Sequence, residues 1–186
     1  TTGLTTYADD HNDQYRCVIS AVGAASPATT NAVTLTVLRT FSITSQPSNA
    51  TANEGATAQF TVATSSSSGT VTYQWERSDD GGANYASVGA TGQAATFTTP
   101  TLVFANDNTD RYRVVASLSG SAADITSTHG ELTVLRVITI STQPQNQGVI
   151  EGNTATFNIV ASITSGAISY QWQKSTNGGA AWTNIN

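Results

Sequence analysis

The chain has 186 residues, of which 38% are hydrophobic and only 10% are charged, and its formal net charge is −5. Soluble domains usually carry about 25% charged residues; here Thr, Ser and Ala fill that share, which is typical of extracellular β-proteins. The seven Lys and Arg residues are scattered, which argues against nucleic acid as a partner, because phosphate binding needs clustered basic side chains. No apolar run approaches the roughly 20 residues of a membrane helix, so we predict no membrane insertion.

The first segment of the chain carries two strand patterns that recur later. They are "DQYRCVIS" at 13–20 and "LTVL" at 35–38, which return as "DRYRVVAS" at 110–117 and "LTVL" at 132–135. The N-terminus has no signal-peptide pattern and no initiator Met, as expected of a processed product or an excerpt of a longer chain. Cys17 is the single cysteine, so any disulfide partner is expected outside this sequence.

The middle and last segments repeat each other in the same way. "YQW" occurs at 73–75 and again at 170–172, an offset of 97 residues. Shifting the chain by 97 pairs residues 1–89 with 98–186, and 36 of these 89 pairs are identical. A repeat of this length indicates a tandem array. We therefore predict a complete unit at 39–135, the C-terminal part of a unit at 1–38 and the N-terminal part of a unit at 136–186.

Each unit reads as a series of short strands. Apolar and polar residues alternate in several windows, and this period of two is the signature of a strand with one buried face. The predicted inward residues are Ala58, Phe60, Val62, Val71, Tyr73, Trp75, Tyr112, Val114, Ala116, Leu132 and Val134. "SDDGG" and "STNGG" have the composition of hairpin turns. No window has a sustained helical period. About seven strands in 97 residues predict an all-β fold of tandem antiparallel β-sandwiches.

Two short motifs resemble the signature of immunoglobulin domains, D-x-Y-x-C. They are "DQYRC" at 13–17, which matches it fully, and "DRYRV" at 110–114, which has Val in place of Cys. The resemblance implies an immunoglobulin-like sandwich in which Val62 and Val114 occupy the positions of the two inter-sheet cysteines. It also implies that Trp75 is the central core tryptophan and Tyr112 the tyrosine-corner residue. The equivalent structural core positions in the partial units are Tyr15, Cys17, Ile159 and Trp172.

Two longer segments of the sequence are similar to bacterial and bacteriophage immunoglobulin-like repeats. The strings are "YRCVISAVGAASPATTNAVTLTV" and "ITISTQPQNQGVIEGNTATFNIVAS". Such repeats occur in large secreted adhesins and in virion structural proteins. The resemblance implies an extracellular or virion-surface location and a role in a fibre or appendage.

No residue set predicts catalysis, a metal site or a cofactor. His11 and His129 lack a second ligand at metal spacing, and the acidic clusters at 9–13, 79–80 and 107–110 match no calcium-loop motif. Solvated loops are the favoured interpretation of both, with calcium between units as the alternative. Tyr85 and Trp182 follow the double glycines and are the candidates for contact with a cell-surface glycan.

These observations favour a non-enzymatic structural segment whose partners are neighbouring repeats or other copies in a fibre or virion. The linker "LRVIT" at 135–139 contains neither Gly nor Pro, so we predict a semi-rigid spacer. The alternative is a carbohydrate- or receptor-binding module of a bacterial surface adhesin. A third hypothesis is self-assembly, in which the partial units at the two ends complete each other between chains by strand exchange.

Overall fold

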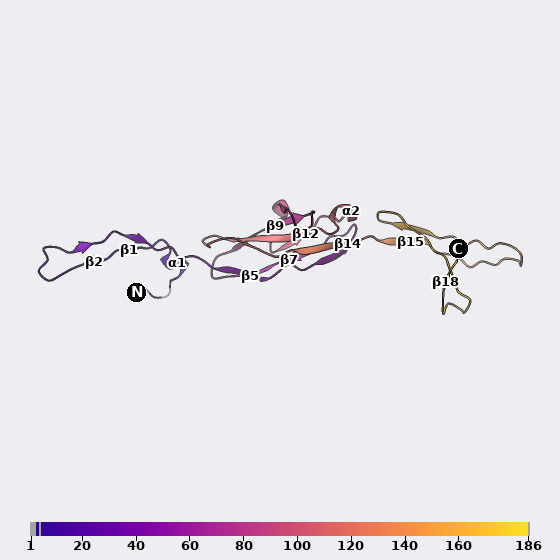
Figure 1. Cartoon of the computed structure of the whole chain (residues 1–186), viewed down its shortest axis with the longest axis horizontal. Coiled ribbons are helices and arrows are strands. Elements are labelled where there is room, and N and C mark those ends of the chain that lie inside the picture. Colours follow the sequence, from indigo (N-terminus) through magenta and orange to yellow (C-terminus); the bar gives the residue numbers. More distant parts are fainter. Residues whose placement is uncertain (1–2, 4, 186) are drawn as a thin grey trace.

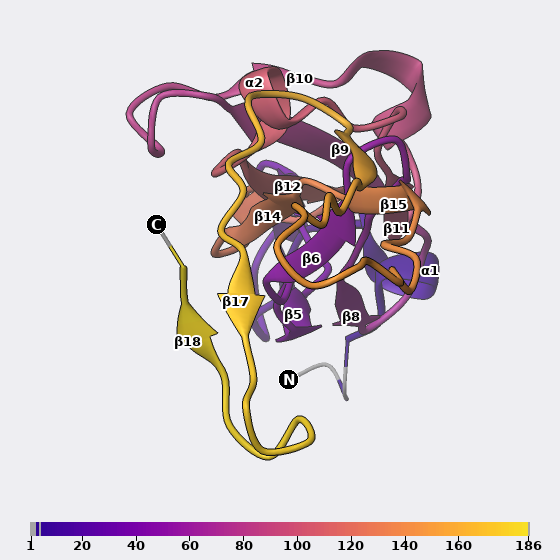
Figure 2. The ribbon, with the colours of Figure 1, turned by 90° about the vertical axis from the view of Figure 1, so that its right-hand side faces the viewer.

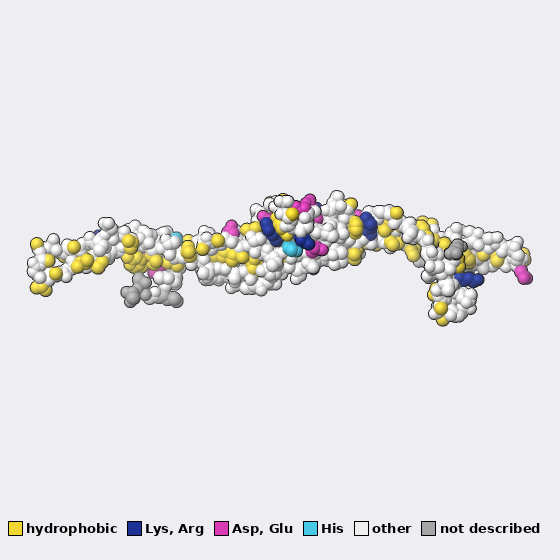
Figure 3. All heavy atoms as spheres, viewed as in Figure 1, with side chains coloured by type: hydrophobic (Ala, Val, Ile, Leu, Met, Phe, Trp, Pro, Cys, Tyr) yellow, Lys and Arg dark blue, Asp and Glu magenta, His cyan; other side chains and the backbone are white. Residues whose placement is uncertain are grey.

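Strands from the middle of the chain form two facing sheets, and a thin arm extends from each end of this central sandwich (Figure 1). The structure is a computed structural model that describes residues 3 and 5–185. In the view along the long axis, the hairpin formed by β17 (Gln173–Lys174) and β18 (Thr183–Asn184) projects to one side (Figure 2). Charged side chains gather on the central sandwich, while hydrophobic side chains line both arms (Figure 3).

The first sheet of the sandwich contains two antiparallel pairs. β5 pairs with β8, and β7 pairs with β11. β7 and β8 follow each other directly and are separated only by Val62. The bounds are Phe41–Ser45 for β5, Gln59–Thr61 for β7, Ala63–Ser66 for β8 and Thr96–Thr98 for β11. The alternating Phe and Thr side chains of this sheet place one face toward the core.

The second sheet has six strands in the order β10-β9-β12-β14-β6, with β13 also paired to β12. Its pairs are antiparallel except β14 with β6, which run parallel. The longest ladder joins β9 to β12, and in it Trp75 lies opposite Val114. The bounds are Ala50–Asn53 for β6, Val71–Ser78 for β9, Ala86–Ser87 for β10, Arg111–Leu118 for β12, Ile125–Thr126 for β13 and Gly130–Leu135 for β14.

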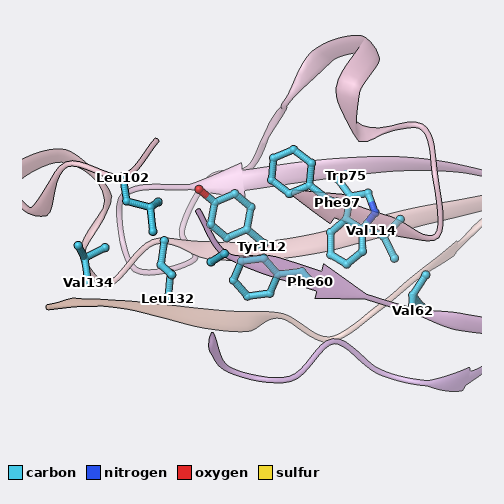
Figure 4. Packing of buried hydrophobic residues seen from close by; sticks show 10 residues of the cluster. Phe60, Val62, Trp75, Phe97, Leu102, Tyr112, Val114, Leu132 and Val134 are labelled. Carbon is cyan, nitrogen blue, oxygen red and sulfur yellow. The ribbon is translucent and has the colours of Figure 1, made fainter. Parts of the chain in front are cut away.

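The core lies between these two sheets, around Trp75. Its side chain is fully buried, and its indole Nε1 donates to the Ala94 carbonyl at 2.9 Å, so no polar atom of the ring is left without a partner. The rings of Phe60 and Phe97 pack against it, and the ring of Tyr112 packs on these two phenylalanines (Figure 4). Burying one such side chain contributes about 1.5–3 kcal/mol. The residues that the alternation predicted to face inward on β12 are the buried ones.

Two valines occupy the interior where the immunoglobulin resemblance implies cysteines. Val62 is 2% exposed and Val114 is 0% exposed. They lie on opposite sheets, Val114 within β12 and Val62 between β7 and β8. The sandwich is therefore held at this point by aliphatic packing and by the aromatic cluster. Two facing sheets, antiparallel except for the β14–β6 pair, confirm by their strand order the predicted all-β, immunoglobulin-like fold.

Two single-turn helices were not predicted. They are α1 (Tyr7–Asp10) and α2 (Phe104–Asp107), at equivalent positions of the repeat before the strand that begins at Gln14 or Arg111. Thr6 caps α1 by accepting from the Asp9 amide. Four residues are too few to show a helical period, so these turns could not be predicted from hydrophobic patterning. A 3-10 turn, η1 (Gly89–Gly92), links β10 to β11.

The arms consist of isolated hairpins. In the first arm β1 pairs with β4 and β2 with β3, and in the second β15 pairs with β16. Tyr15 and Trp172 are 37% and 38% exposed, Cys17 is exposed and Ile159 is half-buried. Among the described residues no second sheet covers these four side chains, so their core roles stay predictions. The bounds are Gln14–Tyr15, Val18–Ile19, Ala28–Thr29 and Val33–Thr34 for β1 to β4, Ile138–Thr142 for β15 and Val160–Ile163 for β16.

Candidate functional site: the junctions between the repeats

The first junction joins the N-terminal arm to the central sandwich through Arg39. Its guanidinium lies 3.8 Å above the centre of the Tyr7 ring, which belongs to α1. Nη1 donates to the Ser119 carbonyl at 2.9 Å and Nε donates to Ser68 Oγ at 3.2 Å. The amide of Arg39 donates to the Gly120 carbonyl at 2.8 Å. The plane of the Arg39 guanidinium therefore contacts the arm, while the N–H groups of the same residue donate hydrogen bonds to the sandwich.

The second junction repeats this arrangement around Arg136. Its guanidinium lies 3.8 Å above the centre of the Phe104 ring, on α2 of the central sandwich. Nε donates to Ser165 Oγ at 3.1 Å, in the turn after β16. Arg136, Phe104 and Ser165 each follow their counterparts in the first junction by 97 residues. The contact is therefore a property of the repeat unit.

Glu54 adds a carboxylate to the second junction. Its Oε2 accepts from Thr164 Oγ1 at 2.6 Å and from Ser165 Oγ at 2.7 Å, and Oε1 accepts from the Phe104 amide at 3.1 Å. The hydroxyls of Thr164 and Ser165 lower the pKa of the Glu54 carboxyl below its ordinary value, because they bond to the ionised form. Glu54 thus joins the sandwich to the second arm while bonded to α2.

A short linker limits movement at the second junction, and close packing limits it at the first. β14 ends at Leu135 and β15 begins at Ile138, so only two residues separate the last strand of the central sandwich from the first strand of the second arm. At the first junction Gly120 has φ +84°, and a Cβ there would lie 2.5 Å from Tyr7 Cε2. Gly120 therefore allows the ring of Tyr7 to lie against the backbone of the central sandwich.

A second polar cluster lies before β12, where an acidic turn was predicted to be solvated. Asp110 is instead only 2% exposed, and its Oδ2 lies 2.5 Å from Arg77 Nε as an ion pair rather than an aligned hydrogen bond. Burial raises the pKa of the Asp110 carboxyl, and Arg77 opposes that shift. Burial also raises the pKa of the Tyr112 hydroxyl, because the ionised form would lose its hydration. This cluster anchors the start of β12 within the sandwich.

The two candidate glycan contacts differ in their surroundings. Tyr85 is half-buried, and the guanidinium of Arg113 lies 3.8 Å above its ring centre. Arg113 in turn bonds Glu76 at 2.7 Å. Trp182, its counterpart in the last segment, is 59% exposed, and its Nε1 donates to the Gly179 carbonyl at 3.1 Å. The contact of either residue with a glycan stays a prediction.

Neither histidine lies in a cluster of metal-ligating side chains within the described residues. His11 stacks on Tyr7 with ring centres 4.4 Å apart, and its Nδ1 accepts from the Val37 amide at 3.2 Å. His11 therefore supports the first junction from the side of the arm. In the part of the chain that the structure describes, no helix has both the length and the apolar character to cross a membrane.

The sequence reasoning did not identify either junction. Arg39 and Arg136 directly follow the repeated "LTVL", but their aromatic partners differ between repeats, Tyr7 in one and Phe104 in the other. A comparison of chemical type instead of identity would have paired these two rings. Glu54 and Glu151 are likewise 97 residues apart, but nothing in the sequence signals that Glu54 reaches the second arm.

No protein family matches the sequence, and no curated protein matches it. Solved structures that are similar include a chimeric titin Z1Z2 (19% identity over 68% of this chain and 65% of that chain, TM-score 0.40). They also include Sidekick-1 immunoglobulin domains 1-5 (16% identity, 86% and 34% coverage, TM-score 0.42) and Dpr2 Ig1-Ig2 with DIP-Theta Ig1-Ig3 (19% identity, 70% and 43% coverage, TM-score 0.37). The chain spans less than two thirds of each of these chains. Because the TM-scores are low, the immunoglobulin-like fold is assigned from the strand order of the molecule itself.

Proposed function

We propose that this chain is a semi-rigid spacer in an extracellular array of immunoglobulin-like units, and that it has no enzymatic activity. The observation that carries the proposal is the repeated junction, in which Arg39 and Arg136 make the same contact with an aromatic ring of the preceding unit. A flexible tether needs no such contact, and Gly- and Ser-rich sequence would serve it better. A spacer with a fixed orientation between successive units needs such a contact at each junction.

The division into units at 1–38, 39–135 and 136–186 is part of this proposal. Residues at core positions of the central sandwich have apolar or aromatic counterparts in both arms, and these are exposed, as for Tyr15 at 37%, Phe157 at 48% and Trp172 at 38%. Adding the remaining strands of each partial unit would cover them. The arms then become parts of further sandwiches of the same design.

The surroundings that fit this role are extracellular. A low content of charged residues together with abundant Thr is typical of extracellular β-proteins. We infer that the array belongs to a bacterial surface protein or a bacteriophage virion fibre, as the similarity of the repeats implies. Its partners are then the neighbouring repeats.

Spin-label distance measurements across the first junction test the stiffness. Cys17 is exposed and is the single cysteine, so it takes one label, and Thr98→Cys in the central sandwich takes the other. We expect a narrow distance distribution, which Arg39→Ala broadens. Arg113→Ala is the matched control, because Arg113 makes the same 3.8 Å contact with Tyr85 inside one unit. A distribution as broad in the unmodified chain as in Arg39→Ala would contradict the spacer.

A further inference from the structure

One side of the central sandwich is open between β10 and β11. The chain crosses from one sheet to the other through η1, and within the described residues no strand lies between β10 and β11. A groove of about 490 Å³ occupies this gap. Its floor is made by Phe97, Leu102 and Tyr112, each 2% exposed, so the groove reaches the aromatic core. Figure 4 shows these three side chains next to one another.

The wall and rim of the groove are held in place. Tyr85 lines the groove, and Arg113 covers one face of its ring. Asn84, also on the rim, donates from Nδ2 to Asp80 at 2.7 Å, which fixes the hairpin tip. Because these side chains are already ordered, a ligand would lose little affinity to ordering them.

The charges of the groove disfavour anions. Its one basic residue, Arg77, is already bonded to Asp110, to Asp107 at 3.4 Å and to the Asn106 carbonyl at 2.9 Å. Asp79, by contrast, has no hydrogen bond or ion pair with the described residues. The groups left for a ligand are therefore the Asp79 carboxylate, the Asn84 amide oxygen and the Thr101 hydroxyl, which together offer more hydrogen-bond acceptors than donors.

We propose that this groove binds a neutral hexopyranose unit of a glycan. A pyranose has an apolar C–H face that packs on an aromatic ring such as Tyr85, and hydroxyl groups that donate to carboxylate and amide oxygens. The volume lies within the range of about 300–1,000 Å³ found for small-molecule sites. This binding site is a function in addition to that of a spacer. It lies on the side of the central sandwich, away from the junctions.

The test uses the full 186-residue chain and nuclear magnetic resonance. Methyl β-D-glucopyranoside, methyl β-D-galactopyranoside and methyl α-D-mannopyranoside are titrated separately, with N-acetylneuraminic acid as the anionic comparison. We expect at least one neutral glycoside to shift the amide signals of Asn84, Tyr85 and Thr101 to saturation. The anionic sugar should produce smaller shifts at the same concentration.

Two variants locate the site. Thr101→Trp fills the groove from an exposed rim position and should abolish the shifts, while Thr72→Trp places the same ring on an exposed position of β9 and should leave them unchanged. Tyr85→Ala should weaken binding at least tenfold. Three outcomes would each overturn the proposal. None of the three neutral glycosides could produce saturable shifts, the shifts could centre on Trp172 or Trp182, or binding could survive Thr101→Trp. The spin-label distances across the junction do not depend on this result, so the spacer and the sugar site fail separately.

Discussion

Substitution of Thr109 tests whether the turn before β12 destabilises the central sandwich through backbone strain. Its φ is +74°, in the left-handed region, and the equivalent residue of the first segment, Asn12, has the same φ. A left-handed conformation costs an L-residue with a Cβ roughly 1–2 kcal/mol, and Asn tolerates it better than a β-branched residue does. The Thr109 side chain is exposed and makes no hydrogen bond with the described residues. Thr109→Asn should therefore stabilise the central sandwich by about 1 kcal/mol.

Urea and thermal unfolding, followed by the fluorescence of the buried Trp75, measure this gain. A change of about 1 kcal/mol corresponds to a rise in Tm of roughly 4–8 °C for a unit of this size. Thr133→Asn is the matched control, since Thr133 is exposed within β14, and there Asn should be neutral or slightly destabilising. Equal effects of the two substitutions, or a loss of stability in Thr109→Asn, would refute the strain argument.

Three further outcomes are expected. Trp75→Ala should lower the free energy of unfolding by about 3–5 kcal/mol, whereas Trp182→Ala, at a side chain that is 59% exposed, should change it by less than about 0.5 kcal/mol; urea titration compares the two. Because the folded-state pKa of Glu54 is lowered, its bonds across the second junction are present above the unfolded pKa and are lost as pH falls through the folded one. Labels at Thr98→Cys and Thr142→Cys in a Cys17→Ser background should show distances broadening on acidification, and Glu54→Gln should remove that pH dependence. Gly120→Ala should broaden the distances across the first junction, since its Cβ would meet the Tyr7 ring; an unchanged distribution would show that the ring does not lie there.

The strands and the core were predictable because they depend on local alternation. Trp75 and the inward residues of β12 follow a period of two, and the repeat doubled the signal at each position. The two helical turns were not predictable, since four residues cannot display a period. Asp110 was expected in solvent because nothing in the sequence links it to Arg77, which lies 33 residues earlier on another strand.

The junctions lay beyond sequence reasoning for a different reason. At the second junction Arg136 lies over Phe104, and Glu54 bonds the Phe104 amide. These residues come from a linker, a helical turn and a strand connection, and only the closed sandwich brings them together. The groove is similar: its floor of Phe97, Leu102 and Tyr112 reads as ordinary core in the sequence. What opens it is the direct crossing from β10 to β11, which is a property of topology.

The parallel pairing of β6 with β14 determines how the sandwich responds to tension. A load applied to the two ends of the chain enters near β5 and β6 and leaves through β14, which continues into β15 after two residues. Four residues of each strand are in register, from Leu132 with Ala50 to Leu135 with Asn53. Pulling such a parallel pair apart lengthwise shears all of its hydrogen bonds together, whereas an antiparallel hairpin pulled from its open end loses them one after another. We therefore expect the central sandwich to resist unfolding when the chain is stretched along its axis.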